Sequence, residues 1–175
     1  MPYCPILGTL AYVFDRPSDR VLLVHRIGRP DDEQLGKWNG LGGKLESNEG
    51  VADGMRRELR EEAGIEVTSM SLRGTVNWPG FGPHGEDWMG FIFLVDTWTG
   101  DPPPANAEGP LEWVPRLRIL QACHDDQSIR RASGLDFWDG DRHFLPLLFD
   151  HDPRPFHGAM PYAHGLPVSW SFERW

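Results

Sequence analysis

Three glutamates, Glu58, Glu61 and Glu62, are spaced so that a helix would bring their carboxylates together. Glu58 and Glu62 are four residues apart, which places them one turn apart on the same side of an α-helix. On that helix they project at the margin of an apolar stripe, where two carboxylates repel each other and lose hydration. A hard divalent cation such as Mg²⁺ would relieve this cost, because it prefers oxygen ligands and shares them with substrate phosphates. The spacing therefore predicts magnesium-dependent phosphate chemistry.

The helix that carries these glutamates is expected to begin near Asn48 or Glu49 and to end at Ala63. Ser47 or Asn48 would cap its first turn, and Gly64 would close it in the left-handed conformation. Its apolar stripe, which would pack on the protein body, consists of residues that recur every four positions and two alanines at the edge: Val51, Met55, Leu59, Ala52 and Ala63.

Two neighbouring features would support the carboxylates. Arg57 stands four residues before Glu61, where an ion pair can hold that carboxylate in one rotamer. The preceding segment GLGGK, residues 40–44, is rich in glycine, so its backbone can turn sharply and approach the carboxylates or a bound phosphate. Near it stand three cations that either meet phosphate oxygens or simply face solvent: Arg26, Lys37 and Lys44.

For the run RELREE alone, a solvated helix face with ion pairs one turn apart is the alternative interpretation. The full segment GKLESNEGVADGMRRELREEAGI, residues 43–65, resembles the signature box of the Nudix hydrolases at every fixed position. The resemblance implies hydrolysis of a nucleoside diphosphate linked to another group, with Mg²⁺ or Mn²⁺ as the cofactor. Gly43 and Glu49 would shape the loop and the start of the helix. The resemblance assigns the metal ligands and the residue that orients them: Glu58, Glu61 and Glu62, with Arg57.

The resemblance leaves the identity of the general base open. Glu61 is one candidate. Glu108 is another, because it lies in the loop where many Nudix enzymes supply a further glutamate, and Glu112 competes with it by position. In the expected mechanism a bound metal lowers the pKa of a water molecule and neutralises charge on the phosphoryl group, and Glu61 or Glu108 accepts the proton.

Apolar clusters rich in valine, leucine and phenylalanine predict the strands. A loop with three consecutive prolines covers residues 100–109, a second helix covers residues 142–149 despite Pro146, and residues 156–175 form a final hairpin. Residues 115–137 show no clear pattern. The chain is thus an α/β protein, and the resemblance implies a single Nudix domain over residues 1–175, an α/β/α sandwich with a mixed β-sheet. The predicted strands are Thr9–Phe14, Arg20–His25, Val67–Val76, Trp88–Thr97 and Leu111–Val114.

The chain of 175 residues has 39% hydrophobic residues and a formal net charge of -9. This charge disfavours nonspecific binding of a nucleic-acid polymer, which depends on basic surface, and leaves a nucleotide as the expected partner. No apolar run approaches the length of a membrane helix, about 20 residues, and the first residues lack the basic region of a signal peptide. We therefore expect a cytoplasmic protein without membrane contact, with a monomer and a homodimer equally open. Cys4 and Cys123 are expected to be ordinary thiols.

Three further segments bear on the substrate: GKWNGLGGK from Gly36, FWDGDRHFLPLLF from Phe137 and FHGAMPY from Phe156. They resemble the MutT-like Nudix hydrolases that act on oxidised purine nucleoside triphosphates. The resemblance implies that Asn39 hydrogen-bonds the purine, that Trp138 stacks on it, and that Trp78 forms an aromatic wall. An aromatic plane stabilises a flat base, and an amide offers both a donor and an acceptor.

One departure from that pattern concerns the base contacts. The similar enzymes carry two adjacent aspartates after the tryptophan, whereas this chain has Gly140 in one of those positions and Asp141 in the other. An insertion also precedes Phe137. For Trp138, a place in the hydrophobic core is the competing interpretation.

These patterns favour hydrolysis of a nucleoside triphosphate such as 8-oxo-dGTP to the monophosphate and pyrophosphate. The Gly140 departure favours the alternative of a Nudix hydrolase for dinucleoside polyphosphates or nucleotide sugars. A noncatalytic nucleotide-binding sensor is the third possibility, although such modules usually lose glutamates of the box, and here all are present.

Overall fold

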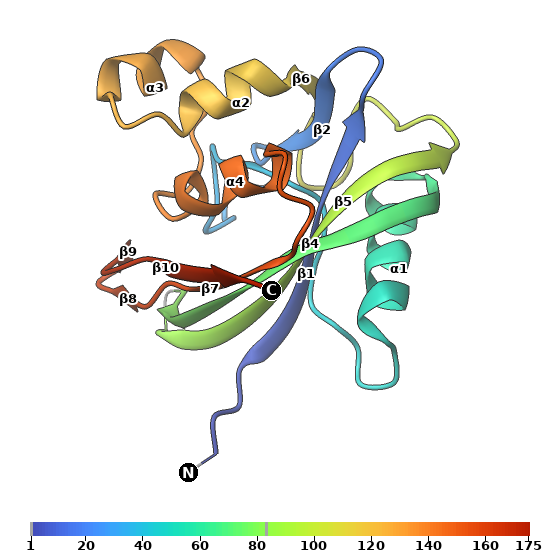
Figure 1. The fold of residues 1–175 in the computed structure, drawn as a ribbon. Coiled ribbons are helices and arrows are strands. Elements are labelled where there is room, and N and C mark those ends of the chain that lie inside the picture. The colour runs from blue at the N-terminus through green and yellow to red at the C-terminus, as the bar shows by residue number, and fades with distance from the viewer. Residues whose placement is uncertain (1, 83) are drawn as a thin grey trace.

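A mixed β-sheet runs through the centre of the molecule (Figure 1). The structure is a computed structural model that describes residues 2–82 and 84–175. The strands are β1 (Ile6–Asp15), β2 (Arg20–His25), β3 (Trp38–Asn39), β4 (Glu66–Phe81), β5 (Glu86–Thr99), β6 (Leu111–Pro115), β7 (Phe156–Ala159), β8 (Tyr162–Ala163), β9 (Leu166–Pro167) and β10 (Ser171–Arg174). In the main sheet they lie in the order β10-β7-β4-β5-β1-β2-β3, and β6 also pairs with β2.

Both strand directions occur in this sheet. β1 runs parallel to β5, and β4 runs parallel to β7, whereas the β1–β2, β4–β5, β2–β6 and β7–β10 pairs are antiparallel. The predicted mixed sheet is therefore confirmed. β8 and β9 form a separate small hairpin.

In the part of the chain that the structure describes, four helices cover the two faces of the sheet: α1 (Val51–Ala63), α2 (Arg116–Ala122), α3 (Gln127–Ser133) and α4 (Asp141–Phe149). In Figure 1, α1 lies on one side of the sheet, and the other three lie on the opposite side. Two buried clusters match these layers. Met55, Leu59 and Ala63 of α1 belong to one cluster, and Ile119 of α2 and Phe144 of α4 belong to the other. The α/β/α sandwich is confirmed.

Strand β1 shows why the sequence folds into these layers. Successive side chains of a strand point to opposite faces. Ala11 and Val13 therefore pack into the cluster under α1, while Tyr12 and Phe14 pack into the cluster under α2 and α4. A central strand buried on both faces has to be apolar at nearly every position, as β1 is.

The start of α1 differs from the prediction. Gly50 occupies the N-cap position without a side-chain hydrogen bond, and the helix begins at Val51. A cap by Ser47 or Asn48 is wrong, because residues 46–49 form a turn of their own, in which the Glu46 N–H donates to the Glu49 carboxylate at 2.8 Å. The end of the helix is as predicted, since Gly64 has a left-handed φ of 64°.

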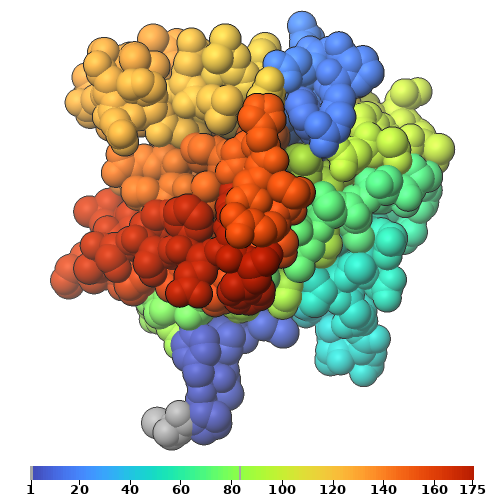
Figure 2. Space-filling view, viewed as in Figure 1, coloured from blue at the N-terminus to red at the C-terminus, as the bar shows by residue number. Residues whose placement is uncertain are grey.

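Other elements extend or complete the predicted ones. β4 and β5 continue beyond their predicted ends and project as a long hairpin, in which Phe81 pairs with Glu86. Residues 115–137, which had no clear pattern, contain the short helices α2 and α3. In Figure 2 these two helices lie above α4, away from α1. Among the described residues, no helix is both long and apolar enough to cross a bilayer.

Candidate active site

The glycine-rich loop before α1 packs directly on two of the predicted glutamates. The Gly42 N–H donates a hydrogen bond of 2.9 Å to the Glu62 carboxylate. A Cβ atom at Gly43 would lie 2.6 Å from Oε1 of Glu58, so only glycine leaves room for that carboxylate. The loop is fixed from its other side by β1, where the Thr9 N–H donates to the Gly43 carbonyl at 2.8 Å. Sheet, loop and helix thus meet at these carboxylates.

Arg57 orients the carboxylates, although Glu61 is not its main partner. Its guanidinium donates two hydrogen bonds to Glu49, of 3.0 and 2.7 Å, and one of 2.9 Å to Glu58. The predicted contact with Glu61 is present at 3.3 Å, and a further bond reaches the carbonyl of Lys44. This pairing lowers the pKa of Glu49 to about 2. Glu49 therefore braces Arg57, which in turn holds Glu58.

Glu62 lies at the edge of the core, where burial disfavours its charged form. Burial, followed by the nearby charge of Glu108, raises the pKa of Glu62 to about 8, while the Gly42 N–H and Arg26 act in the opposite direction. Burial also raises the pKa of Glu58. Two desolvated carboxylates close to a third one are unfavourable unless a cation joins them.

These carboxylates fit a hard divalent cation by their chemistry, because all of the donors are oxygens and burial disfavours the charge of Glu58 and Glu62 unless a cation is bound. Glu58 and Glu62 are shielded by the loop, whereas the Glu61 side chain is 59% exposed. Within residues 2–82 and 84–175, no three acidic, histidine or cysteine side chains converge on one point. The Glu58 carboxylate is held in place by its ion pair with Arg57 at 2.9 Å.

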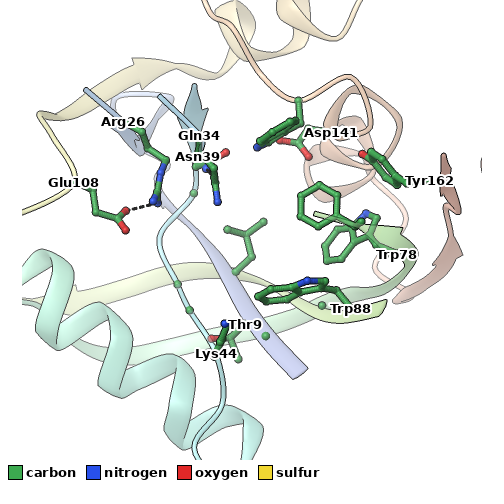
Figure 3. Close-up of a pocket in the computed structure, with 18 residues that line it drawn as sticks. Thr9, Arg26, Gln34, Asn39, Lys44, Trp78, Trp88, Glu108, Asp141 and Tyr162 are labelled. Carbon is green, nitrogen blue, oxygen red and sulfur yellow. Dashed lines mark hydrogen bonds and ion pairs between the residues drawn. The ribbon is translucent and has the colours of Figure 1, made fainter. Parts of the chain in front are cut away.

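Glu108 lies beside this cluster, whereas Glu112 does not. The carboxylate of Glu108 pairs with Arg26 at 2.5 Å (Figure 3). Its position in the loop is fixed by the Asn106 side chain, which accepts from the Glu108 N–H at 2.9 Å, and by the Gly28 N–H, which donates to the Glu108 carbonyl at 2.7 Å. Glu112 is exposed on β6 and does not line the cavity.

A cavity of about 300 Å³ opens next to the loop and Glu108. Figure 3 shows Asn39 and Asp141 on one side of it and Trp88 and Lys44 on the other. The residues predicted to contact the base line this cavity, together with one of the predicted lysines: Asn39, Trp78, Trp138, Asp141 and Lys44. Gly42, Gly43 and Glu108 line it as well, so the cavity reaches the loop that packs on Glu58 and Glu62, whereas Glu58, Glu61 and Glu62 do not line it themselves.

The two predicted lysines have different positions. Lys44 lines the cavity, and its ammonium lies 5.2 Å from the ring centre of Trp88. The Lys37 ammonium pairs with Asp136 at 2.9 Å and lies 5.3 Å from the ring centre of Trp138. Lys37 is absent from the cavity wall and instead supports Trp138 from outside it.

Sequence analysis missed several residues of the wall. Trp88 and Tyr162 add aromatic surface, and the side-chain oxygen of Gln34 accepts a hydrogen bond from the Asn39 amide. The glycine at position 90 could have indicated that Trp88 lies in the wall. Gly90 stands two positions after Trp88 on the same face of β5, and a side chain at position 90 would collide with the ring of Trp78. A glycine between large aromatic residues in a strand indicates a close approach of this kind.

Asp141 is the acidic group of the aromatic compartment. Burial raises the pKa of Asp141 to about 7, while the charge of Lys37 and a backbone hydrogen bond at Trp138 act in the opposite direction. A side chain at Gly140 would collide with the hydroxyl of Tyr162. The tyrosine hydroxyl therefore occupies the space that a second aspartate would need.

The pKa of Asp141 gives a prediction for stability. In the unfolded chain its pKa is about 3.9, so rising pH ionises the unfolded state first and stability falls between about pH 4 and pH 7. Above about pH 7, Asp141 is ionised in both the folded and the unfolded protein, and the loss of stability is complete. Asp141→Asn removes this loss, so the difference in Tm between variant and wild type should increase from pH 5 to pH 8. Thermal melts of both proteins in the two buffers measure it, and a constant difference would contradict the raised pKa.

Comparison with known proteins agrees with this geometry. Residues 5–132 match the family model described as NUDIX domain. The chain belongs to the Nudix family. An uncharacterised Nudix hydrolase of Bacillus subtilis, YvcI, is 33% identical over 148 residues, which cover 83% of this chain and 81% of that protein. The oxidized purine nucleoside triphosphate hydrolase of Mus musculus is 32% identical over 114 residues, which cover 65% of this chain and 63% of that protein.

A solved structure supports the MutT-like form of the Nudix fold. The mutator MutT protein of Bacillus halodurans superimposes with a TM-score of 0.74 at 25% identity, and the match covers 96% of this chain and 97% of that one. In a Nudix hydrolase, the catalytic residues are expected on α1 and on the glycine-rich loop that precedes it. These comparisons support a pyrophosphohydrolase of this family.

Proposed function

We propose that this Nudix hydrolase cleaves a nucleoside triphosphate to the monophosphate and pyrophosphate, with an oxidised purine such as 8-oxo-dGTP as the preferred base. One observation carries the proposal. A single cavity joins an aromatic compartment, with Asn39 and Asp141 in its wall, to the loop that packs on Glu58 and Glu62. A flat base and a charged phosphate chain would find matching surfaces at its two ends.

The phosphate end would use the carboxylates. Glu58, Glu61 and Glu62 would hold Mg²⁺, or Mn²⁺ in its place, and the bound ion would neutralise phosphate charge and lower the pKa of a water molecule. Arg57 keeps Glu58 in place through the contacts described above. The proton acceptor would be Glu61 or Glu108. Glu61 is the less constrained of the two, because its one ion pair is the 3.3 Å contact with Arg57, whereas Glu108 is paired with Arg26 at 2.5 Å.

The base end would use stacking and hydrogen bonds. Trp138 would stack on the base, with Trp78 as a second wall. Gln34 accepts from the Asn39 amide nitrogen, which leaves the amide oxygen of Asn39 available as an acceptor. Asp141, whose pKa is raised to about 7, would offer either a donor or an acceptor near neutral pH.

A substrate panel tests this proposal. The rate of pyrophosphate or phosphate release is measured with Mg²⁺ for 8-oxo-dGTP, dGTP, the other nucleoside triphosphates, a diadenosine polyphosphate and a nucleotide sugar. We expect kcat/KM for 8-oxo-dGTP to exceed that for dGTP by about tenfold or more, since one differential hydrogen bond is worth about 1.4 kcal/mol. Equal values of kcat/KM for 8-oxo-dGTP and dGTP would contradict the proposed preference for an oxidised base.

One observation favours the alternative of a substrate with a second bulky group. The cavity continues past Trp88 into a second space of about 420 Å³, whose wall also includes His84, Glu86 and Gly165. Gln34, Lys44, Phe81, Trp88, Trp138 and Tyr162 line both spaces. A higher kcat/KM for the diadenosine polyphosphate or the nucleotide sugar in the same panel would select this alternative.

A further inference from the structure

A separate cavity of about 400 Å³ lies between α2, α3 and the start of α4. Figure 1 shows these helices on the face of the sheet opposite α1. Its wall contains no residue of the segment 43–65, and Trp138 is the only residue that it shares with the cavity of the active site among the described residues. The residues that matter here are Gln127, Arg130, Arg131, Trp138, Asp139 and Arg142.

The cavity wall is rich in arginine, although the chain has a net charge of -9. Arg130, Arg131 and Arg142 line it, and Arg118 reaches the same region, since its guanidinium would lie 3.1 Å from a Cβ atom at Gly134. Within the described part of the chain, none of these four arginines forms an ion pair. Most of the other arginines do form one: Arg16, Arg26, Arg56, Arg57, Arg60, Arg73, Arg116, Arg154 and Arg174.

Two of these arginines are held by neutral backbone groups. The Arg130 guanidinium donates to the carbonyls of His124 and Asp125, both at 2.6 Å. The Arg118 guanidinium donates to the Ser133 carbonyl at 2.5 Å. These contacts position the guanidinium groups and leave their charge without a counterion. A fixed donor without a counterion is prepared for an anionic ligand.

Arg142 adds an unsatisfied donor at the same place. Its Nε atom is fully buried, and no hydrogen-bond acceptor among the described residues contacts it. This atom itself has no surface open to the cavity, and no acceptor within the described residues lowers the cost of burying it.

The two carboxylates on this wall do not neutralise the arginines. Asp136 is engaged by Lys37 at 2.9 Å, and its side chain is mostly exposed. Asp139 is exposed and forms no ion pair within the described ranges. The three arginines of the wall therefore outnumber its two carboxylates and are not paired with them.

We propose that this cavity, here called the arginine cavity, binds a phosphoryl anion of a small molecule. Guanidinium groups match the oxygens of a phosphate as paired donors, and three arginines line this space. The volume lies within the usual range of small-ligand sites, roughly 300–1,000 Å³. Inorganic pyrophosphate and a nucleoside monophosphate are two sources of the same chemistry.

The shared Trp138 gives the arginine cavity a consequence for the active site. An anion in the arginine cavity would contact one side of the segment that carries Trp138, whose other side faces the aromatic compartment. An anion that shifts Trp138 would couple the two sites, and such coupling acts equally in both directions. The anion is therefore expected to change KM for the nucleotide more than kcat.

Calorimetric titration of the metal-free protein tests the site. Wild type, Arg131→Gln and the control Arg56→Gln are each titrated with inorganic pyrophosphate and, separately, with deoxyadenosine monophosphate. Arg131 is exposed, so its truncation leaves the core intact, and Arg56 is an exposed arginine on α1. We expect Arg131→Gln to weaken the binding of at least one of the two anions by about tenfold, the usual value of one charged hydrogen bond, and Arg56→Gln to have no effect.

Three outcomes would overturn the proposal. They are the absence of saturable binding to wild type, equal affinity in Arg131→Gln and wild type, or binding of an oligonucleotide through Arg131 where both small anions fail. If only the monophosphate binds, the source is a nucleotide, and if pyrophosphate suffices, the phosphoryl groups alone are recognised. Because the titration contains no metal and no turnover, its failure is independent of any failure of the proposed hydrolysis.

Discussion

Replacing Glu62 by glutamine is expected to lower kcat/KM by a factor on the order of 10² to 10³, corresponding to about 3–4 kcal/mol of lost transition-state stabilisation. The reason is the charge of Glu62. A glutamine keeps an oxygen that can accept the 2.9 Å hydrogen bond from the Gly42 N–H, so the loop stays in place. It lacks the negative charge that would bind the metal. Initial rates of hydrolysis, measured at a series of Mg²⁺ concentrations up to saturation, test this prediction.

Glu66→Gln is the matched control for this experiment. Glu66 is exposed and pairs with Arg60, on the side of α1 that faces away from the cavity. We expect its activity to stay within about twofold of wild type, as for most exposed ion pairs. The melting temperature of metal-free Glu62→Gln should not fall, because burial already disfavours the charged form of Glu62 and a neutral glutamine carries no such cost. Near-normal turnover of Glu62→Gln would contradict the metal assignment, and a large fall in its melting temperature would contradict the account of the loop.

Sequence analysis was most successful where contacts are local. The four-residue spacing of Met55 and Leu59 fixed the buried side of α1, and Gly64 closed the helix in the predicted conformation. The predicted contact between Arg57 and Glu61, one turn apart on the helix, is present, whereas its main partner Glu49 lies before the helix and was not predicted. Helical periodicity is enough for inferences of this kind.

Contacts between distant segments could not be predicted in the same way. Arg26 meets Glu108 only because β2 and the loop before β6 come together in the sheet. Tyr162 reaches the cavity from the C-terminal region, and its place beside Gly140 depends on the register of β7 and the hairpin that follows. The pairing register of strands far apart in the chain is decided by packing, which a single sequence does not reveal.

The cap of α1 shows a different limit. Ser47 and Asn48 are good capping residues, yet the helix begins after Gly50. The carboxylate of Glu49 binds the Glu46 N–H and Arg57, and this arrangement determines how the chain enters the helix. A tertiary ion pair thus overrides the local preference for a cap.

A large loss of stability is expected at Gly42, where an alanine should lower the free energy of unfolding by about 3 kcal/mol or more. Gly42 has a φ of 150°, and a Cβ atom there would overlap the carbonyl oxygen of Thr9. The strain cannot relax through a side chain, because Thr9 is held on β1 by its backbone hydrogen bond to Gly43. For a chain of this length the loss corresponds to a fall in Tm of roughly 6–12 °C.

Gly43→Ala is the control that separates stability from catalysis. Its Cβ atom would meet the end of the Glu58 side chain at 2.6 Å, and a carboxylate can rotate away where a carbonyl oxygen cannot. We therefore expect Gly43→Ala to melt within a few degrees of wild type and yet to lose most of its activity, because Glu58 leaves its position beside Arg57. Thermal melts and initial rates of both variants measure the contrast. If Gly42→Ala melts like wild type, the close packing of the loop on β1 is wrong, and if Gly43→Ala is fully active, the position of Glu58 is not needed for turnover.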